Sequence, residues 1–177
     1  RGSGRGVPGI NLVQILHQCK DHLLHWGGHP VAVGLSLHEK NIDSFTKAFI
    51  DAIFEQNEGK FEEPSLQLDL IISSSELQPE LLNELNLLTP FGQENPEPIL
   101  AIRKTKLAHA PKKVGSGEHF QFSVHNGTRL IQGIAWKMAS RMPPADTEID
   151  LAFRLRWNEW NGRKSLQMVL EDWKVSV

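Results

Sequence analysis

The sequence predicts an α+β chain, in which a small α/β unit is followed by a second unit of five β-strands. Helix-spaced and strand-like apolar segments alternate through residues 1–73. A Pro-rich segment then interrupts the chain at residues 89–98, and short alternating segments with Asn-Gly turns fill residues 99–177. The 177 residues are 40% hydrophobic and 23% charged, which excludes collagen-like, coiled-coil and wholly disordered chains.

The first unit, residues 1–73, is expected to contain two helices and two strands. Apolar residues at helical spacing predict a helix over residues 11–25, with Asn11 as its N-cap and Gly27-Gly28 at its end. The remaining elements are a buried strand at 31–37, a helix starting near Asn41 or Asp43 and continuing through Ile53, and a strand at 66–72.

Residues 74–98 are expected to connect the two units. Ser75 and Pro79 open a predicted helix that continues to Leu88. Three Pro and one Gly between residues 89 and 98 prevent the helix from continuing, so the domain boundary is placed here.

The second unit, residues 99–177, is expected to be an OB-fold. Strands are predicted near 99–109, 119–125, 129–136, 148–158 and 164–175, with a short helix from Ala135 to Arg141. Five strands with a helix between the third and fourth is the order of this small, partly open barrel, which binds oligonucleotides and oligosaccharides. Other small β-barrels would give a similar pattern.

The charges and the single cysteine narrow the functional class. Residues 1–94 carry 6 Lys+Arg and 13 Asp+Glu, whereas residues 95–177 carry 13 and 8, so the second unit is basic. A basic unit suggests a nucleic-acid partner, although the same charge also serves ordinary solubility. Cys19 has no possible intrachain disulfide partner and lies on an apolar stripe, which fits a core position and a cytoplasmic location. No apolar run is long enough for a membrane span, so no membrane partner is expected.

Two loops of the second unit carry the candidate nucleic-acid-binding residues. Bases stack on aromatic rings while Lys and Arg contact phosphates, and OB-folds often clamp a strand between the first-to-second and fourth-to-fifth strand loops. The candidates are Lys112, Lys113, Trp157, Asn158, Trp160, Arg163 and Lys164. Phe120, Phe122, Phe153 and Trp173 are expected in the core, and Trp160 is the aromatic expected to be exposed.

The Gly-rich segments Arg1–Gly6 and Gly27–His29 are candidates for binding phosphate. Glycine lets a backbone approach a ligand, and its N–H groups can converge on a phosphate oxygen. Arg can bind phosphate through two hydrogen bonds, and His can donate one. A helix end with two glycines is the alternative interpretation. His22 and His25 with Asp21 could in principle hold a metal, although surface histidines are the simpler interpretation.

Five motifs in order resemble the RecJ family, bacterial single-strand-specific DNA exonucleases of the DHH phosphoesterase superfamily. They are Gly-Ser-Gly-Arg (2–5), Pro-Gly-Ile-Asn-Leu (8–12), Trp-Gly-Gly-His-Pro-Val-Ala-Val-Gly-Leu-Ser-Leu (26–37), Pro-Phe-Gly-Gln-Glu-Asn-Pro-Glu-Pro (90–98) and Asn-Glu-Trp-Asn-Gly-Arg-Lys-Ser-Leu-Gln (158–167). The resemblance covers essentially the whole chain. It implies a C-terminal portion of such an enzyme, with a DHH-associated domain at 1–73 and a single-stranded-DNA-binding OB domain at 99–177.

The resemblance also implies how the chain takes part in the reaction. Arg5, Gly27, Gly28 and His29, with Ser3 as a weaker candidate, match motifs that hold substrate phosphate. A DHH domain outside these 177 residues would bind Mn or Mg and hydrolyse DNA in the 5′ to 3′ direction, in DNA repair and recombination. We therefore expect no catalytic residue, metal or cofactor in this chain, and no hydrolysis by it alone.

The sequence departs from the family pattern at one position. Gly6 stands where the family often has Ser, so this residue has no hydroxyl to contact a ligand. Single-stranded DNA, single-strand-binding protein and the DHH domain are the expected partners. A non-catalytic scaffold whose OB domain binds protein is the alternative function, and a phosphodiesterase acting on small nucleotides is less consistent with an OB domain.

Overall fold

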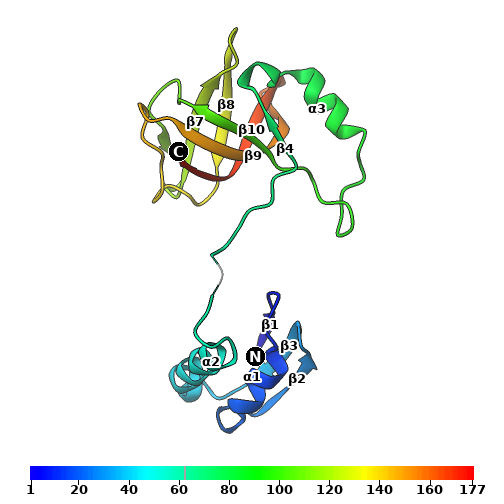
Figure 1. Ribbon diagram of the computed structural model, residues 1–177, viewed down its shortest axis with the longest axis vertical. Helices are drawn as coiled ribbons and strands as arrows, with labels where there is room; N and C mark the ends of the chain where they lie inside the picture. The colour runs from blue at the N-terminus through cyan, green and yellow to red at the C-terminus, as the bar shows by residue number, and fades with distance from the viewer. Residues whose placement is uncertain (62) are drawn as a thin grey trace. The chain divides into compact units, whose positions relative to one another are not determined.

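The computed structural model describes residues 1–61 and 63–177, which divide into two compact units, Arg1–Ser65 and Leu66–Val177 (Figure 1). The mixed α and β character predicted from the sequence is confirmed. The division falls between Ser65 and Leu66, whereas the Pro-rich segment 89–98 was the predicted boundary. Among the described residues, no helix is long and apolar enough to cross a membrane.

The first unit is a three-stranded antiparallel sheet with two helices. Its elements are β1 (Gly2–Arg5), α1 (Leu12–Gln18), the short 3-10 helix η1 (Lys20–His22), β2 (His25–His29), β3 (Ala32–Ser36), the 3-10 helix η2 (Glu39–Asn41) and α2 (Ile42–Gln56). The strand order is β1-β3-β2, so β3 pairs on both sides. The core of this unit consists of Leu12, Ile15, Leu16, Cys19, Val33 and Ala52.

Helix α1 is shorter than the predicted helix over residues 11–25. The Asn11 side chain accepts a hydrogen bond from the Gln14 backbone N–H (3.2 Å), as predicted for an N-cap, but the helix ends at Gln18. Gly27 and Gly28 lie in strand β2, so the prediction that they end the helix is wrong. Their backbone pairs with β3 instead, because a long-range ladder of hydrogen bonds outweighs the local helical spacing of Leu23 and Trp26.

The other predicted elements of this unit are largely confirmed. Strand β3 lies within the predicted run 31–37, and α2 begins after Asn41. The Asn41 side chain donates to the His22 carbonyl oxygen (3.2 Å) and makes no cap hydrogen bond. Cys19 is buried, as predicted, and burial raises the pKa of its thiol.

The second unit contains a seven-stranded sheet. Its elements are β4 (Leu70–Ile72), the 3-10 helix η3 (Ser74–Glu76), α3 (Pro79–Asn86), β5 (Leu100–Thr105), β6 (Lys112–Val114), β7 (His119–His125), β8 (Leu130–Ala135), β9 (Ile149–Trp160) and β10 (Arg163–Val175). The strand order is β4-β5-β9-β10-β8-β7-β6. Strand β4, expected in the first unit, instead pairs in parallel with β5.

The ends of this sheet approach each other. The Ala108 backbone N–H, just after β5, donates to the Ser123 carbonyl oxygen of β7 (2.8 Å). The enclosed core is built from alternating strand residues and is completed by Leu77 and Leu82 at the start of the α3 region. Phe120, Phe122 and Phe153 lie in this core, as predicted, and Trp173 packs against it partly buried.

Of the two predicted Asn-Gly turns, only Asn161-Gly162 is a tight turn. At Asn126-Gly127 only the glycine has positive φ (96°), and the loop between β7 and β8 extends to Arg129. Asn161 and Gly162 both have positive φ (49° and 72°), the backbone that a tight β9–β10 hairpin requires. The segment from Ala135 to Arg141 forms no helix, so that prediction is wrong. Its backbone is fixed elsewhere: the Ala139 N–H donates to the Glu118 carbonyl oxygen (3.1 Å), and Trp173 Nε1 donates to the Arg141 carbonyl oxygen (2.7 Å).

Candidate nucleic-acid interface

The three-stranded sheet places Arg5 and His29 on one face. Arg5 in β1 and His29 in β2 both lie opposite Ala32 of the central strand. Residues directly opposite each other on paired strands point to the same side of a sheet. Both side chains are exposed, so a cation and an imidazole stand on either side of a methyl group on an open surface.

The next set of cross-strand partners on this face consists of very small residues. Ser3 and Gly27 both lie opposite Gly34, two residues along each strand from the first row. A Cβ added to Gly27 or Gly34 would have no atom within 4 Å, so the backbone here is open to a ligand. The opposite face is different, because Val33 is buried against the helices. We call the exposed face formed by Ser3, Arg5, Gly27, His29, Ala32 and Gly34 the small-residue face.

Gly28 lies on the other side of the same strand and has a structural role. Its φ is +142°, and a Cβ there would lie 2.3 Å from the Ala32 carbonyl oxygen. Glycine is required by this close approach of two strands rather than by a ligand on the small-residue face. The expected loop of converging N–H groups is replaced by paired strands, so Gly27 and Gly34 provide an open floor instead.

Ala32 and Gly34 are not among the site residues predicted from the sequence. The signal was present, since Ala32, Gly34 and Ser36 alternate with the larger Val33 and Leu35. A strand with one small-residue side and one apolar side has a packed face and a free face. The run was interpreted only as a buried strand, and the free side was not considered.

Arg5 makes a local contact in the absence of a ligand. Its Nη1 donates to the Gly4 carbonyl oxygen (3.0 Å), a contact at the surface. Among the described residues it has no salt-bridge partner. The guanidinium therefore keeps donors free for an anion.

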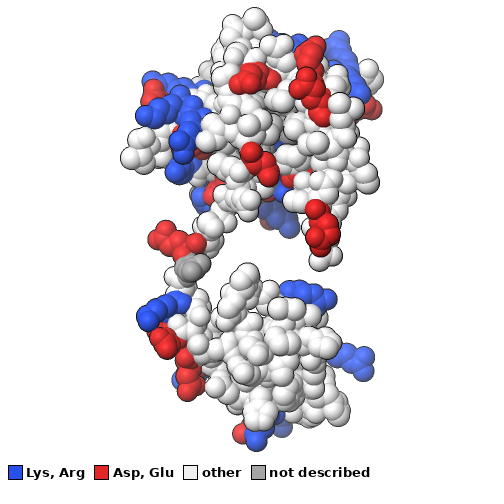
Figure 2. Space-filling model, turned by 45° about the vertical axis from the view of Figure 1, so that its right-hand side comes forward, with Lys and Arg blue, Asp and Glu red and all other residues white. Residues whose placement is uncertain are grey.

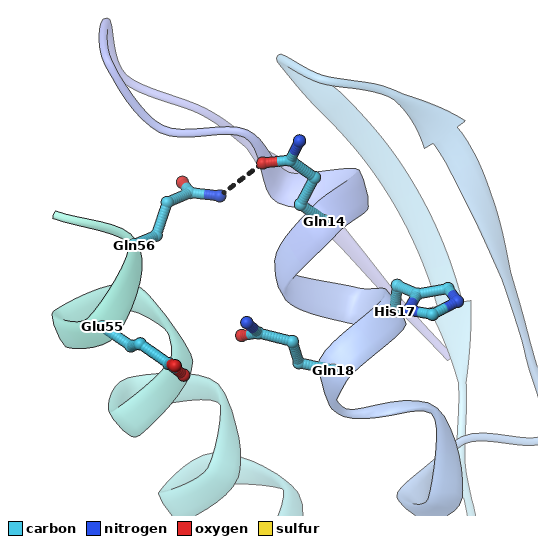
Figure 3. A pocket seen from close by; sticks show the side chains of 5 residues that line it. All are labelled: Gln14, His17, Gln18, Glu55 and Gln56. Atoms are coloured by element: carbon cyan, nitrogen blue, oxygen red, sulfur yellow. Dashed lines mark hydrogen bonds between the residues drawn. The ribbon is translucent and has the colours of Figure 1, made fainter.

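A shallow pocket in the same unit lies between α1 and α2 and is not part of the small-residue face. Figure 3 shows Gln14, His17, Gln18, Glu55 and Gln56 around it, with Gln56 Nε2 donating to Gln14 Oε1 (3.1 Å). Gln56 also accepts from the Asn11 backbone N–H (2.8 Å) and donates to the Asn11 carbonyl oxygen (3.2 Å). These bonds join the two helices, so the pocket is a structural junction.

In the second unit, the β9–β10 hairpin divides the predicted residues between two faces. Trp157 pairs with the buried Leu166 and packs partly buried against the core. Lys164 Nζ lies 4.7 Å from the centre of the Trp157 ring and 3.8 Å from the Glu159 carboxylate. Trp157 and Lys164 thus stabilise each other on the core side of the hairpin.

The other face of the hairpin carries Asn158, Trp160 and Arg163. Trp160 lies opposite Arg163, and Asn158 lies opposite Ser165. Trp160 is 73% exposed, which confirms the expectation that this ring is not core. A planar cation and an exposed indole side by side are the two groups that contact phosphate and base in single-strand complexes.

The lysines of β6 are also divided. Lys112 lies opposite Gln121, on the outer face of the sheet, whereas Lys113 lies opposite the buried Phe120 at the sheet edge. Gln121 pairs with Ile134 of β8, and Ile134 pairs with Val169 of β10. Lys112 and Val169 therefore lie in the same row of cross-strand partners. Arg163 lies six residues before Val169 on the same side, which is roughly 20 Å at about 3.3 Å per residue.

Neutral amides occupy the surface between these two groups. Gln132 in β8 pairs with Gln167 in β10, which in turn pairs with Arg156 in β9. Together with Gln121 they form an outer face that offers both donors and acceptors. We call this surface, bounded by the Lys112 row and the Trp160–Arg163 row, the amide face. Sequence analysis did not identify its glutamines, because they belong to different strands.

Some basic residues beside the amide face are already paired with acids. Arg154 forms ion pairs with Glu97 and Glu171, and Arg156 forms one with Glu97. The hydrogen bond from Arg156 to the Glu97 carboxylate raises the pKa of Arg156 above its ordinary value. Figure 2 accordingly shows separate groups of Lys/Arg and Asp/Glu on the visible side of this unit, not one continuous basic surface.

The described residues contain no group of three or more His, Cys, Asp or Glu side chains that could hold a metal ion. His22 Nδ1 lies 3.1 Å from Ser44 Oγ, and His17 packs edge-on against Trp26. The side chains of the described residues therefore do not provide the ligands of a two-metal nuclease centre.

Comparison with known proteins identifies the family. The model of the RecJ OB domain matches residues 68–172. The chain is 32% identical over 176 residues to the single-stranded-DNA-specific exonuclease RecJ of Thermus thermophilus, covering 97% of this chain and 24% of that protein. The chain belongs to the RecJ family.

Other RecJ proteins show the same partial overlap. The enzyme of Dickeya dadantii is 32% identical over 179 residues, covering 97% of this chain and 31% of its own length. A crystal structure of Thermus thermophilus RecJ in complex with Mn²⁺ matches with a TM-score of 0.69 and 27% identity, covering 99% of this chain and 26% of that one. A second structure contains Mg²⁺. The chain thus spans about a quarter to a third of the length of its RecJ relatives.

Proposed function

We propose that the chain is the substrate-binding C-terminal portion of a RecJ-like 5′ to 3′ single-stranded-DNA exonuclease. The RecJ OB match supports this, because it falls on the unit whose amide face lies between Trp160–Arg163 and Lys112. In this proposal, residues 66–177 hold the DNA strand and residues 1–65 form the DHH-associated domain, which holds the phosphate near the bond to be cleaved.

The small-residue face has the chemistry that phosphate requires. Arg5 can donate two hydrogen bonds to a phosphate, and His29 can donate a third from the other side of Ala32. The open backbone at Gly27 and Gly34 lets the anion approach closely, and Ser3 adds a hydroxyl at the rim. To bind, Arg5 exchanges its hydrogen bond to the Gly4 carbonyl oxygen for the stronger bonds to an anion.

In the second unit, β5, β7, β8, β9 and β10 would form the five-stranded OB barrel. The parallel pairing of β8 with β10 and the contact of Ala108 with Ser123 support this assignment. Strands β4 and β6 then extend the barrel at its two edges. OB-folds use the loop between their first two strands and the loop between their last two, which here contain Lys112 and the Trp160–Arg163 turn.

Hydrolysis would depend on a DHH domain outside these 177 residues. Mn or Mg bound there would activate the attacking water. In this proposal, the residues of the present chain bind the strand and orient the phosphate.

The decisive experiment is fluorescence anisotropy of the 177-residue chain with labelled single-stranded and duplex oligonucleotides over a series of salt concentrations. We expect tighter binding to the single strand, weakening by about 0.7 log units per log unit of salt for each phosphate contacted. Replacing Lys112 and Arg163 by Ala should reduce this slope, whereas Lys60→Ala, which removes a lysine already paired with Glu58, should not. Equal affinity for duplex, or no binding at low salt, would overturn the proposal.

A further inference from the structure

A second exposed indole lies on the same unit, at Trp136. Trp136 is 56% exposed and lies directly after the last residue of β8. Its ring centre lies 4.9 Å from that of His119, and the two planes meet at 75°, an edge-to-face arrangement. Tryptophan is enriched at interfaces, because its ring is apolar and its N–H can donate a hydrogen bond.

The surroundings of Trp136 are fixed by hydrogen bonds. The Lys137 backbone N–H donates to His119 Nδ1 (2.8 Å), which orients the imidazole that touches the indole. The residue before Trp136, Ala135, pairs with Phe120 in the β7–β8 ladder and is fully buried. The ring is therefore held in place without being covered, which reduces the entropy that a ligand must remove when it stacks there.

Trp136 serves no evident packing purpose, in contrast to Trp173. Trp173 packs against the core and donates its Nε1 hydrogen to the Arg141 carbonyl oxygen. The Trp136 indole N–H makes no hydrogen bond within the part of the chain that the structure describes. A structural Trp would be expected to have one or both of these contacts.

Trp136 and Trp160 mark the two ends of the amide face. His119 lies on the outer side of β7, one residue before the inward-facing Phe120, so its partner Trp136 lies on the outer side as well. Ile134, two residues before Trp136, pairs with Val169 of β10. The six residues from Val169 back to Arg163, the partner of Trp160, correspond to roughly 20 Å at about 3.3 Å per residue, the approximate length of sheet between the two ends.

The surface between the two rings suits a nucleic-acid strand. Gln121, Gln132 and Gln167 lie on it, and their amides can hydrogen-bond to base edges or sugars. Lys137 follows Trp136 in the sequence, Lys112 lies opposite Gln121, two residues from His119 along β7, and Arg163 lies opposite Trp160. All three side chains belong to exposed residues. Each ring therefore has a cation for the phosphate of the nucleotide stacked on it.

We propose that Trp136, held by His119, is a second base-stacking platform, and that Trp136 and Trp160 together set the length of single strand that residues 66–177 hold. This inference rests on the proposed function, since it specifies how the same unit binds its strand. It assigns a ligand, a nucleobase within a single strand, to a residue that the strand-loop pattern of the OB-fold does not point to.

The test measures affinity against oligonucleotide length, from about 4 to 16 nucleotides. With strands long enough to reach both rings, Trp136→Ala should weaken binding by about 5-fold to 150-fold, the effect of one stacked base. The shortest strands can bind at the Trp160 end alone, so their affinity should change little. Trp136→Phe keeps a stacking ring and should restore most of the affinity.

Fluorescence gives a second readout that does not depend on the Ala variant folding. A base stacked on Trp136 should quench it, so saturating DNA should reduce the emission of the unmodified chain more than that of Trp136→Phe. If the unmodified chain binds single strands and Trp136→Ala binds them equally well at every length, this inference is overturned, whereas the proposed function stays in place. A loss of the same size at every length, or equal quenching, would also overturn it. Failure of the unmodified chain to bind would reject the proposed function and this inference together.

Discussion

Arg5 and His29 lie opposite the same residue, Ala32, on the two sides of strand β3. This shared register brings two residues 24 positions apart in sequence onto one open face. Next to them, Gly34 separates Ser3 from Gly27 in the same way. The pairing of three short strands thus creates the small-residue face, and the following predictions test what it and the second unit do.

Filling the floor of the small-residue face should block phosphate without unfolding the unit. Gly34→Val adds a branched side chain at a position where an added Cβ would have no atom within 4 Å, and branched residues suit strands. We expect at least about a 10-fold loss in affinity for a 5′-phosphorylated dinucleotide, with a free energy of unfolding within about 1 kcal/mol of the parent chain. Isothermal titration calorimetry measures the affinity, and urea denaturation measures the free energy of unfolding. The affinity of Gly34→Ala should lie between those of the parent chain and Gly34→Val. Unchanged affinity for Gly34→Val would exclude this face as the phosphate site.

Gly27 and Gly28 should differ sharply in their tolerance of alanine. A Cβ at Gly28 would lie 2.3 Å from the Ala32 carbonyl oxygen and 2.8 Å from Val33 Cα, in a backbone with φ +142°. Gly28→Ala should therefore lower the free energy of unfolding of the first unit by about 1–3 kcal/mol or more. Gly27→Ala, where the added atom has open space, is the matched control and should cost less than about 1 kcal/mol. Chemical denaturation followed by circular dichroism compares them, and equal losses would contradict the assigned roles.

The exposed indole of Trp160 should contribute directly to strand binding. Trp160→Ala should weaken binding of a single-stranded oligonucleotide by about 1–3 kcal/mol, the effect of losing one base stack. Leu87→Ala removes another exposed apolar side chain of the same unit, 84% exposed, and should have no effect. Anisotropy titrations of both variants at one salt concentration decide the matter. Unchanged affinity for Trp160→Ala would return the ring to a purely structural role.

Gly133 should be essential to the core of the second unit. It lies opposite Phe122, and a Cβ there would lie 2.1 Å from Phe122 Cζ. Because the ring is confined by a closely packed core, Gly133→Ala should destabilise the unit by about 1–3 kcal/mol. Gly92→Ala, with no atom within 4 Å of the added methyl, is the control for urea denaturation. A stable Gly133→Ala variant would show that Phe122 can move aside.

Asp150 should make stability depend on acid pH. Partial burial opposes its charge, but Ser176 Oγ (2.6 Å) and the Lys104 backbone N–H (3.1 Å) donate to it, and its pKa is lowered overall. A lowered folded-state pKa means that the charged group stabilises the fold above the unfolded pKa of about 3.9, and that this contribution is lost as pH falls through the folded value.

Asp150→Asn should therefore cost about 1–2 kcal/mol at neutral pH, and the difference from the parent chain should shrink below about pH 4. Thermal denaturation between about pH 3 and pH 7 measures this dependence. A difference that stays constant over the whole range would show that the hydrogen bonds, rather than the charge, account for the effect.

Local sequence patterns were enough to indicate most of the strands and helices, the tight turn at Asn161-Gly162 and the family that the chain resembles. Period-2 and period-3.6 patterns, Asn161-Gly162 and the ordered motifs are local properties, so they can be identified without knowing any contact. Local pattern does not predict the structure of residues 26–28. Trp26 has helical spacing, and Gly27-Gly28 is typical of a helix end, but all three residues pair with β3, a segment whose position only the folded chain reveals.

Tertiary structure decided which residues meet. Strand register placed Arg5 and His29 on one face, on either side of Ala32, and divided Trp157 from Trp160 between opposite faces of one hairpin. It also placed Gln121, Gln132 and Gln167 on one face of the larger sheet. A shift of register by one residue turns every side chain of a strand to the other face. The residue types of a binding site can therefore be predicted from sequence, whereas the surface they share depends on how distant strands pair.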